Sequence, residues 1–255
     1  MIALNHKIFG EGDPIIILHG LFGMLDNWQS FAKKLAEDYM VILIDQRNHG
    51  KSPHSEEFNY TLLAEDLKYF LDTNWMYKVH IIGHSMGGKT AMQFANLFPD
   101  TVDKLIVVDI GPNQNPRGHD SIFEALNSVN ISKISSRKEV QEILSSKIDD
   151  ISVILFLMKN LQRNKSGGYK WKMNLTSLEK NYKNILAGIE VDTLIEVDTV
   201  FVRGDRSNYI TTEVEQDIKD KFTSYKIETI KDSGHWIHAE QADALYKTII
   251  DSLQS

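Results

Sequence analysis

Residues His80 to Thr90 read HIIGHSMGGKT, in which one serine stands between glycines, directly after an apolar run and directly before a helical pattern. Glycine costs conformational entropy inside regular structure, so Gly83 and Gly87 indicate a turn that requires small residues. The stretch from Gly83 to Gly87 matches G-x-S-x-G, a pattern that lifts a serine hydroxyl above a sheet when a strand precedes it and a helix follows. The helix start adds unpaired N–H groups and a positive dipole end. We therefore predict Ser85 as a nucleophile and disfavour the alternative of a turn without chemistry.

The segments on either side alternate between short β-branched runs and amphipathic patterns. Nearly continuous apolar runs, typical of strands buried on both faces of a parallel sheet, lie at 14–20, 39–47, 79–85 and 104–111. Helical patterns lie between them at 27–38, 61–73 and 89–98. Strand patterns return at 199–204 and 225–230, before a last helix from about Ile237. This alternation predicts an α/β fold with a doubly wound, mostly parallel sheet.

The middle of the chain interrupts this alternation. Residues 113–190 contain helical patterns such as HDSIFEALNSV and RKEVQEILSSKI, but no convincing strand pattern. We interpret this segment as a helical cap inserted into the sheet domain. The predicted organisation is a core built from residues 1–112 and 191–255, with residues 113–190 as the cap.

Composition narrows the possible functions. A chain of 255 residues with 42% hydrophobic residues can bury a sizeable core, and its net charge of -7 disfavours a nucleic-acid partner. The absence of cysteine excludes disulfides and thiolate chemistry, and without HExxH or a phosphate-binding glycine loop we expect no metal and no cofactor. The sequence shows no signal-peptide pattern and no apolar run of about 20 residues. We expect a cytoplasmic protein without a membrane partner, and no pattern indicates its oligomeric state.

A serine hydroxyl needs a base to take its proton, and an imidazole suits that task near neutral pH. Among nine histidines, His235 stands out because DSGHW follows the last predicted strand, at the sheet edge where ligands bind in open α/β folds. His238 is interpreted as a surface residue or as one that contacts the site residues without touching the substrate. His84 and His19 flank apolar strand ends and are interpreted as structural.

The tetrahedral intermediate of acyl transfer needs hydrogen-bond donors aimed at its oxyanion. The turn HGLFG, His19 to Gly23, follows the first long predicted strand, and its glycines allow backbone to approach the site. The expected donors are the backbone amides of Leu21 and of Met86, the residue after the nucleophile.

Five segments together resemble the α/β-hydrolase superfamily: LHGLFGMLDNW, IDQRNHGKSP, GHSMGGKTAM, DKLIVVDIGP and GHWIHAE. More narrowly, they resemble the small bacterial esterases of the YbfF type, relatives of an animal abhydrolase-domain protein. The resemblance covers the whole chain and is weakest in the insertion. It implies hydrolysis of short acyl esters and, as an extension, of acyl-CoA thioesters.

The third member of a catalytic triad orients the imidazole and stabilises its cation. Most α/β-hydrolases carry this acid in the loop after the strand at 199–203, but the usual position there is Ser207, and Asp205 stands two places too early. Asp109 closes the strand after the nucleophile's own strand, a location used in the branch named above. We favour Asp109 and keep Asp205 as the alternative. Ser207 is expected to hydrogen-bond His235 or its acid.

Substrate contacts are harder to assign from the sequence. The basic stretch 159–172, with Lys165 and Lys170, fits either the phosphates of a CoA ester or a solvated surface. Arg117 fits either an acidic acyl tail or a loop salt bridge. Four apolar cap residues fit either an acyl pocket or helix packing: Phe123, Phe156, Leu157 and Met158.

The predicted function is a serine esterase acting on a small-molecule acyl ester through Ser85, His235 and Asp109. Carbon–carbon bond hydrolysis and perhydrolysis are alternatives that use the same serine. Dehalogenase and epoxide hydrolase chemistry would require aspartate at position 85 and is disfavoured. From another class, the chain could be a ligand-binding sensor with little turnover.

Overall fold

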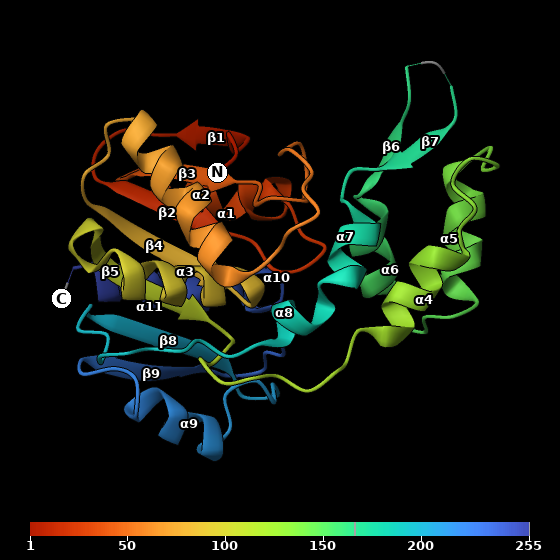
Figure 1. Ribbon diagram of the computed structural model, residues 1–255. Coiled ribbons are helices and arrows are strands. Elements are labelled where there is room, and N and C mark those ends of the chain that lie inside the picture. The colour runs from red at the N-terminus through yellow and green to blue at the C-terminus, as the bar shows by residue number, and fades with distance from the viewer. Residues whose placement is uncertain (166, 255) are drawn as a thin grey trace.

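The computed structural model describes residues 1–165 and 167–254 of the chain. Its centre is a seven-stranded sheet in the order β1-β3-β2-β4-β5-β8-β9 (Figure 1). The strands are β1 (His6–Phe9), β2 (Pro14–Leu18), β3 (Met40–Ile44), β4 (Val79–His84), β5 (Val102–Val108), β8 (Thr199–Gly204) and β9 (Tyr225–Ile230). All neighbouring strands are parallel except β1, which pairs antiparallel with β3. The predicted α/β class with a mostly parallel sheet is confirmed.

Helices cover both faces of this sheet, because successive side chains of each strand point to opposite faces. On β2, Ile16 and Leu18 join the core beneath one set of helices: α2 (Tyr60–Thr73), α3 (Met86–Leu97) and α9 (Thr212–Lys219). Ile15 and Ile17 join the core on the other face, beneath α1 (Gln29–Leu35) and α11 (Ala242–Leu253). The doubly wound arrangement expected from the alternating pattern is therefore present.

The insertion lies between β5 and β8, beyond the carboxyl ends of the strands (Figure 1). Its helices are α4 (Asp120–Ser128), α5 (Arg137–Ser145), α6 (Ile151–Met158), α7 (Leu175–Lys180) and α8 (Tyr182–Leu186). The expectation that this segment has no strand was wrong. A hairpin of β6 (Leu161–Arg163) and β7 (Tyr169–Trp171) projects from it. Strands of three residues are too short to show an alternating pattern in the sequence.

Three boundaries differ from the expectations in ways that affect the site. Helix α3 begins at Met86, directly after Ser85, and not at Lys89. The helix expected over 27–38 is divided into a 3₁₀ turn, η1 (Leu25–Trp28), and α1. The last helix is divided into α10 (Ile237–Glu240) and α11. Separately, a second 3₁₀ turn, η2 (Pro99–Thr101), precedes β5. No helix in the described part of the chain is both long enough and apolar enough to span a bilayer.

Candidate active site

Ser85 lies on the sharp turn between β4 and α3. Its backbone has φ 54° and ψ -121°, in the left-handed region that non-glycine residues rarely adopt. The flanking glycines allow the turn because backbone passes close to them. A Cβ on Gly83 would lie 2.4 Å from the carbonyl oxygen of Gly87, and one on Gly87 would lie 2.3 Å from that of Leu18. The glycines are therefore required by close backbone packing, which holds the serine above the sheet edge.

Three side chains from different elements form a connected chain of hydrogen bonds. Nε2 of His235, in the loop after β9, lies 3.0 Å from Oγ of Ser85. Nδ1 of the same ring lies 2.7 Å from Oδ2 of Asp109, which directly follows β5. Asp109 is fully buried, whereas the His235 side chain is 25% exposed. A serine, a base and a buried orienting carboxylate are thus in hydrogen-bond contact, which is the geometry that nucleophilic catalysis requires.

The Asp109 carboxylate has two further donors on the neighbouring β8 segment. The Gly204 amide donates to its Oδ1 at 3.1 Å, and the Ser207 hydroxyl donates to its Oδ2. Asp205 is exposed and accepts a hydrogen bond from the Ser233 amide at 3.2 Å. Backbone hydrogen bonding from Asp232, followed by that from Ser233, lowers its pKa. The structure therefore joins Asp109 to His235 and places Asp205 in a surface turn.

His235 is also held through its ring face and its backbone. Tyr209 stacks on the imidazole with ring centroids 4.1 Å apart. Nε2 of His84 lies 2.8 Å from the His235 carbonyl oxygen, so this nitrogen carries the proton and donates it. Burial, followed by the nearby His235, lowers the pKa of His84 well below its usual range. His84 is therefore a neutral, buried histidine with a structural role, as expected, and it fixes the backbone of His235.

The turn after β2 has a defined set of backbone hydrogen bonds. The Phe22 amide donates to Nε2 of His49 at 3.2 Å, and the Gly23 amide donates to the Gly20 carbonyl oxygen at 3.0 Å. From the insertion, the Asn160 side chain donates to the Phe22 carbonyl oxygen at 2.7 Å. Among the hydrogen bonds of the described residues, none is donated by the amide of Leu21 or Met86. These two amides are thus available to a bound oxyanion.

A cavity of about 470 Å³ opens beside Ser85 and His235, between the sheet edge and the insertion. Ligand pockets typically have volumes of about 300–1,000 Å³ and apolar walls. The apolar part of this wall is made by Leu21, Phe22, Trp28, Ile122, Val153, Leu155, Phe156, Leu157 and Trp236. The site can therefore accept an apolar organic molecule with its reacting group at Ser85.

Several known proteins resemble this chain in sequence and in structure. The alpha/beta hydrolase fold family matches residues 13–131. A putative esterase/lipase of Haemophilus influenzae is 39% identical over 92% of this chain and 81% of its own, and esterase YbfF of Escherichia coli is 36% identical over 94% and 92%. A solved marine microorganism esterase has a TM-score of 0.97 and 43% identity, covering 98% of this chain and 99% of its own. The chain belongs to the α/β-hydrolase family. The predicted family and the prediction of a carboxylic-ester hydrolase are confirmed.

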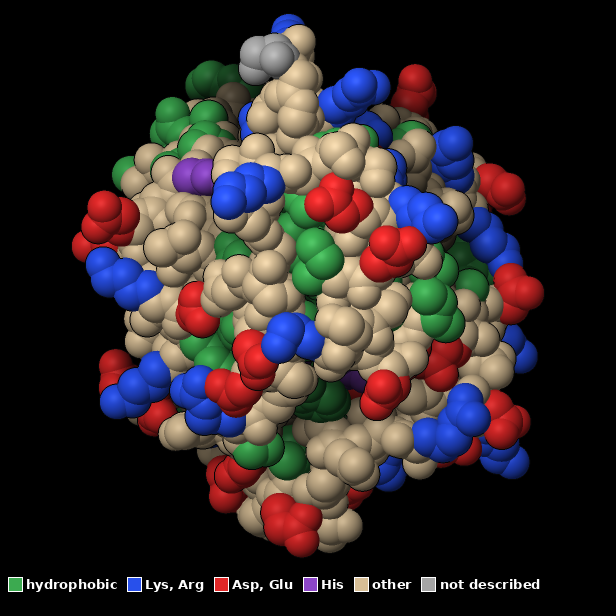
Figure 2. Space-filling model, turned by 90° about the vertical axis from the view of Figure 1, so that its right-hand side faces the viewer, with side chains coloured by type: hydrophobic (Ala, Val, Ile, Leu, Met, Phe, Trp, Pro, Cys, Tyr) green, Lys and Arg blue, Asp and Glu red, His purple; other side chains and the backbone are tan. Residues whose placement is uncertain are grey.

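Two suggested substrate contacts of this hydrolase lie away from the cavity. Arg117 is exposed, pairs with Asp120 and lies over the Tyr182 ring at 5.0 Å, so the structure shows the loop salt bridge and no contact with an acyl tail. Lys165 and Lys170 are exposed on the projecting hairpin, and Lys159 alone among the described residues of the basic stretch lines the cavity. The face in Figure 2 mixes acidic and basic side chains and shows no concentrated basic patch.

The apolar residues expected at an acyl pocket divide into two groups. Phe156 and Leu157 line the large cavity of the hydrolase. Phe123 and Met158 are buried and absent from its described lining. Phe123 packs edge-on against Phe22, with ring centroids 5.1 Å apart. Helix packing therefore explains Phe123 and Met158.

The structure places one further residue at the site, which no pattern in the sequence distinguishes. His119 lines the large cavity, and burial lowers its pKa to about 4. Its Nδ1 lies 2.9 Å from the Tyr182 hydroxyl, which also accepts the His119 amide. The partner lies 63 positions away, so no local pattern could reveal this contact.

His238 is half-buried and lines the same cavity, so it is less exposed than a surface residue would be. It stacks on Trp28 with ring centroids 4.3 Å apart, and burial lowers its pKa to about 3.

No group of three or more His, Asp or Glu side chains in the described residues is arranged to hold a metal ion. That the hydrolase works without metal or cofactor stays a prediction.

Proposed function

We propose that this hydrolase is a serine esterase that cleaves short-chain acyl esters through a covalent acyl-enzyme. Ser85 is the nucleophile, His235 the general base and acid, and Asp109 the carboxylate that orients the imidazole. The amides of Leu21 and Met86 form the oxyanion hole, and residues 113–190 act as a cap over the site. The single observation that carries the proposal is the continuous hydrogen-bond chain from Ser85 Oγ through His235 to buried Asp109.

Acylation follows from these contacts. As Ser85 Oγ attacks the ester carbonyl carbon, its proton passes to Nε2 of His235 over the 3.0 Å contact. The carbonyl oxygen becomes an anion and accepts hydrogen bonds from the two free amides. When the intermediate collapses, the bond to the alcohol oxygen breaks and His235 returns the proton to that oxygen. The alcohol leaves, and the acyl group remains on Ser85.

Deacylation repeats the sequence with water. His235 takes a proton from the water molecule, whose oxygen attacks the acyl carbon. Collapse then breaks the bond to Ser85 and returns the proton to Oγ. Because Asp109 accepts from Nδ1 at 2.7 Å, it keeps the proton on Nδ1 and leaves Nε2 free to act as base. Ser207 and the Gly204 amide hold the carboxylate in that orientation.

Oxyesters are the substrates that the site favours over CoA thioesters. The same atoms can cleave a thioester, but recognition of CoA requires cations at its phosphates. Lys159 is the member of the basic stretch that lines the cavity, whereas Lys165 and Lys170 are carried on the hairpin. We therefore propose small, mostly apolar esters as the substrate class and keep thioesters as a secondary activity.

The test uses p-nitrophenyl acetate and p-nitrophenyl octanoate with the wild-type protein and Ser85→Ala. Hydrolysis of the acetate by the wild type, lost in Ser85→Ala with the fold intact, is expected. Binding of either ester without turnover would instead favour the ligand sensor. Faster cleavage of a vinylogous diketone than of every ester tested would favour carbon–carbon hydrolysis. Faster formation of a peracid from hydrogen peroxide than hydrolysis of every ester tested would favour perhydrolysis.

A further inference from the structure

Ser85 lies where two unequal cavities meet. The large cavity of about 470 Å³ also contains His235 in its wall. On the other side of the serine is a cavity of about 30 Å³, whose lining includes Ser85, Met86 and Leu21. His235 is absent from the described lining of the small cavity. The two spaces therefore differ both in size and in access to the proton-transferring imidazole.

The chemistry decides which part of an ester enters each cavity. The tetrahedral carbon carries Ser85 Oγ, the oxyanion, the leaving alcohol oxygen and the acyl chain. Since His235 must give its proton to the leaving oxygen, the alcohol has to lie on the side of the imidazole, in the large cavity. The oxyanion faces the amides of Leu21 and Met86. The remaining direction, next to these two residues and away from His235, leads into the small cavity.

The small cavity has a rigid wall. Tyr60, Ile110 and Leu186 line it and are all buried. The Tyr60 hydroxyl donates to the Ile185 carbonyl oxygen at 2.5 Å, which ties α2 to α8. A volume of about 10–15 Å³ by this measure is needed for one water molecule. The space of about 30 Å³ therefore holds about two non-hydrogen atoms beyond the carbonyl carbon.

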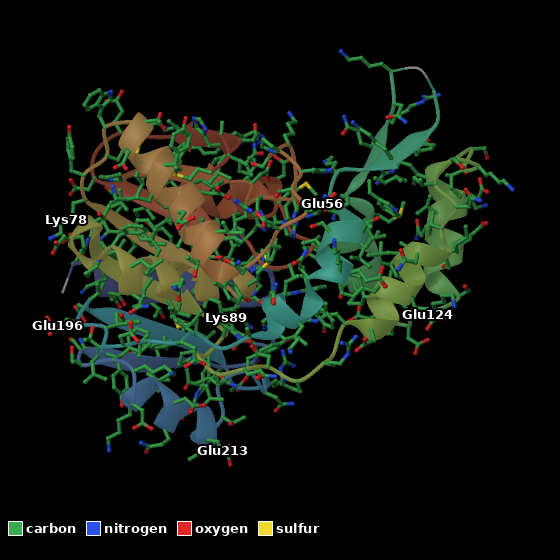
Figure 3. All side chains as sticks on the ribbon, in the orientation of Figure 1. Glu56, Lys78, Lys89, Glu124, Glu196 and Glu213 are labelled. Carbon is green, nitrogen blue, oxygen red and sulfur yellow. The ribbon has the colours of Figure 1, made fainter. Side chains whose placement is uncertain are left out.

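Lys89, labelled in Figure 3, belongs to the lining of this small cavity. Its ammonium group is buried and donates to three backbone carbonyl oxygens: those of Asn113 at 2.7 Å, Leu186 at 3.3 Å and Ala187 at 2.6 Å. Asn113 lies where the chain enters the insertion, and Leu186 and Ala187 lie where it leaves. Lys89 therefore ties both connections to α3 and keeps the Leu186 side of the wall in place.

We propose that the small cavity is the acyl subsite and the large cavity the alcohol subsite, so that the preferred substrates are acetyl and propionyl esters of bulky, apolar alcohols. This rests on the proposed function and specifies its substrate class. Chain length is limited on the acyl side by Leu186, Ile110 and Tyr60. On the alcohol side, the aromatic and aliphatic wall of the large cavity accepts rings or long alkyl groups.

Two ester series separate the subsites in the wild-type protein. In the first, the acyl group of p-nitrophenyl esters is lengthened from acetate through propionate and butyrate to hexanoate. We expect kcat/KM to fall about 100-fold by hexanoate, because chain atoms without room must displace packed side chains. In the second, phenyl acetate is compared with 1-naphthyl acetate, whose leaving groups have similar acidity. Here we expect equal or higher kcat/KM for the larger alcohol.

A pair of variants assigns the effect to the small cavity. Leu186→Ala keeps the carbonyl that binds Lys89 but removes part of the wall, and should raise the hexanoate-to-acetate ratio of kcat/KM about 10-fold. Leu155→Ala, in the large cavity, is the matched control and should leave that ratio unchanged while altering the naphthyl-to-phenyl ratio. Leu186→Val serves if the alanine variant does not fold, with a smaller rise expected.

The outcomes are distinguishable. A wild type that hydrolyses hexanoate as well as acetate, or that responds to Leu155→Ala in place of Leu186→Ala, overturns the assignment of the subsites while the esterase stands. A wild type that hydrolyses none of the esters overturns the proposed function and this inference together.

Discussion

Nε2 of His84 donates a hydrogen bond to the backbone carbonyl of His235 at 2.8 Å, so the residue before Ser85 fixes the loop that carries the His235 imidazole. The two residues are 151 positions apart: His84 directly precedes Ser85, and His235 contacts Ser85 Oγ through its Nε2. Through this bond, the strand that positions the serine also positions the imidazole.

Replacing His84 with phenylalanine should lower kcat while leaving KM for a small ester nearly unchanged. The variant removes the donor but keeps a ring, and a displacement of about 1 Å at a reacting group can cost about 100-fold in rate. We expect a loss of about 10- to 100-fold with p-nitrophenyl acetate. His80→Asn, at the opposite end of β4, is the matched control and should retain kcat. A His84→Phe variant with wild-type kcat would show that the bond does not position the base.

Asp109→Asn should reduce kcat far more than Asp205→Asn. Losing the triad carboxylate typically costs about 10⁴-fold, because the imidazole then adopts the wrong tautomer. Asp205 lies in an exposed turn and accepts a hydrogen bond from the Ser233 amide, with no contact to His235 among the described hydrogen bonds, so its amide variant should stay within about 2-fold of wild type. The measurement is kcat for both variants on one ester, with thermal unfolding to confirm the fold. The opposite ranking would move the acid to the β8 loop.

Stability should fall as the pH drops below 6.5, because buried histidines stay neutral in the folded protein. Burial lowers the pKa of His19 to about 4 and that of His49 to about 3, whereas both return to about 6.5 on unfolding. Between these values the unfolded chain binds more protons, so acidification favours unfolding. Each histidine contributes about 1.4 kcal/mol per pH unit in that window.

Urea unfolding at pH 7.5, 6.5 and 5.5 measures this effect, above the range in which carboxylates titrate. His49→Gln should be less stable at pH 7.5 but should lose about 1 kcal/mol less between pH 6.5 and 5.5, because the unfolded ring is only half protonated at pH 6.5. An unfolding free energy that is flat from pH 7.5 to 5.5 would show that these rings are protonated in the folded state.

Truncating one side chain of the buried Arg47–Asp66 ion pair should reduce the free energy of unfolding more than truncating a side chain of an exposed ion pair. Arg47 Nε lies 2.6 Å from Asp66 Oδ2, and the two side chains are only 3% and 1% exposed. Asp66→Ala leaves a buried guanidinium without its counter-charge and should cost about 3–5 kcal/mol. Asp72→Ala breaks the exposed pair with Lys68 and should cost under about 1 kcal/mol. Equal losses in urea unfolding would contradict this account.

Much of the fold and of the candidate site could be anticipated because the signals were local. Buried parallel strands appear as apolar runs, and the turn around Ser85 has its glycines within two residues. The preference for Asp109 over Asp205 rests on the resemblance to the YbfF branch together with the place of Asp109 at a strand end. The structure joins Asp109 to His235, although the catalytic role itself stays a prediction.

What the sequence missed depends on contacts between distant segments or on elements too short to show a period. The edge strand β1 has mostly exposed residues, and β6 and β7 have three residues each. His119 gains its place through Tyr182, and Arg117 is held by Asp120 in the loop where a substrate contact had been considered. Cavity volumes are likewise set by packing between α2, α8 and the sheet, which no single segment encodes.

Covalent labelling of the serine tests the central claim most directly. The wild-type protein is treated with a fluorophosphonate at pH 7.5, and the labelled site is located by intact mass and peptide mapping. We expect one equivalent on Ser85, no label on Ser85→Ala, and labelling of His235→Ala that is slower by about 1,000-fold or more. Modification at another residue, or an unchanged labelling rate in His235→Ala, would contradict the account that the imidazole at 235 activates the hydroxyl at 85.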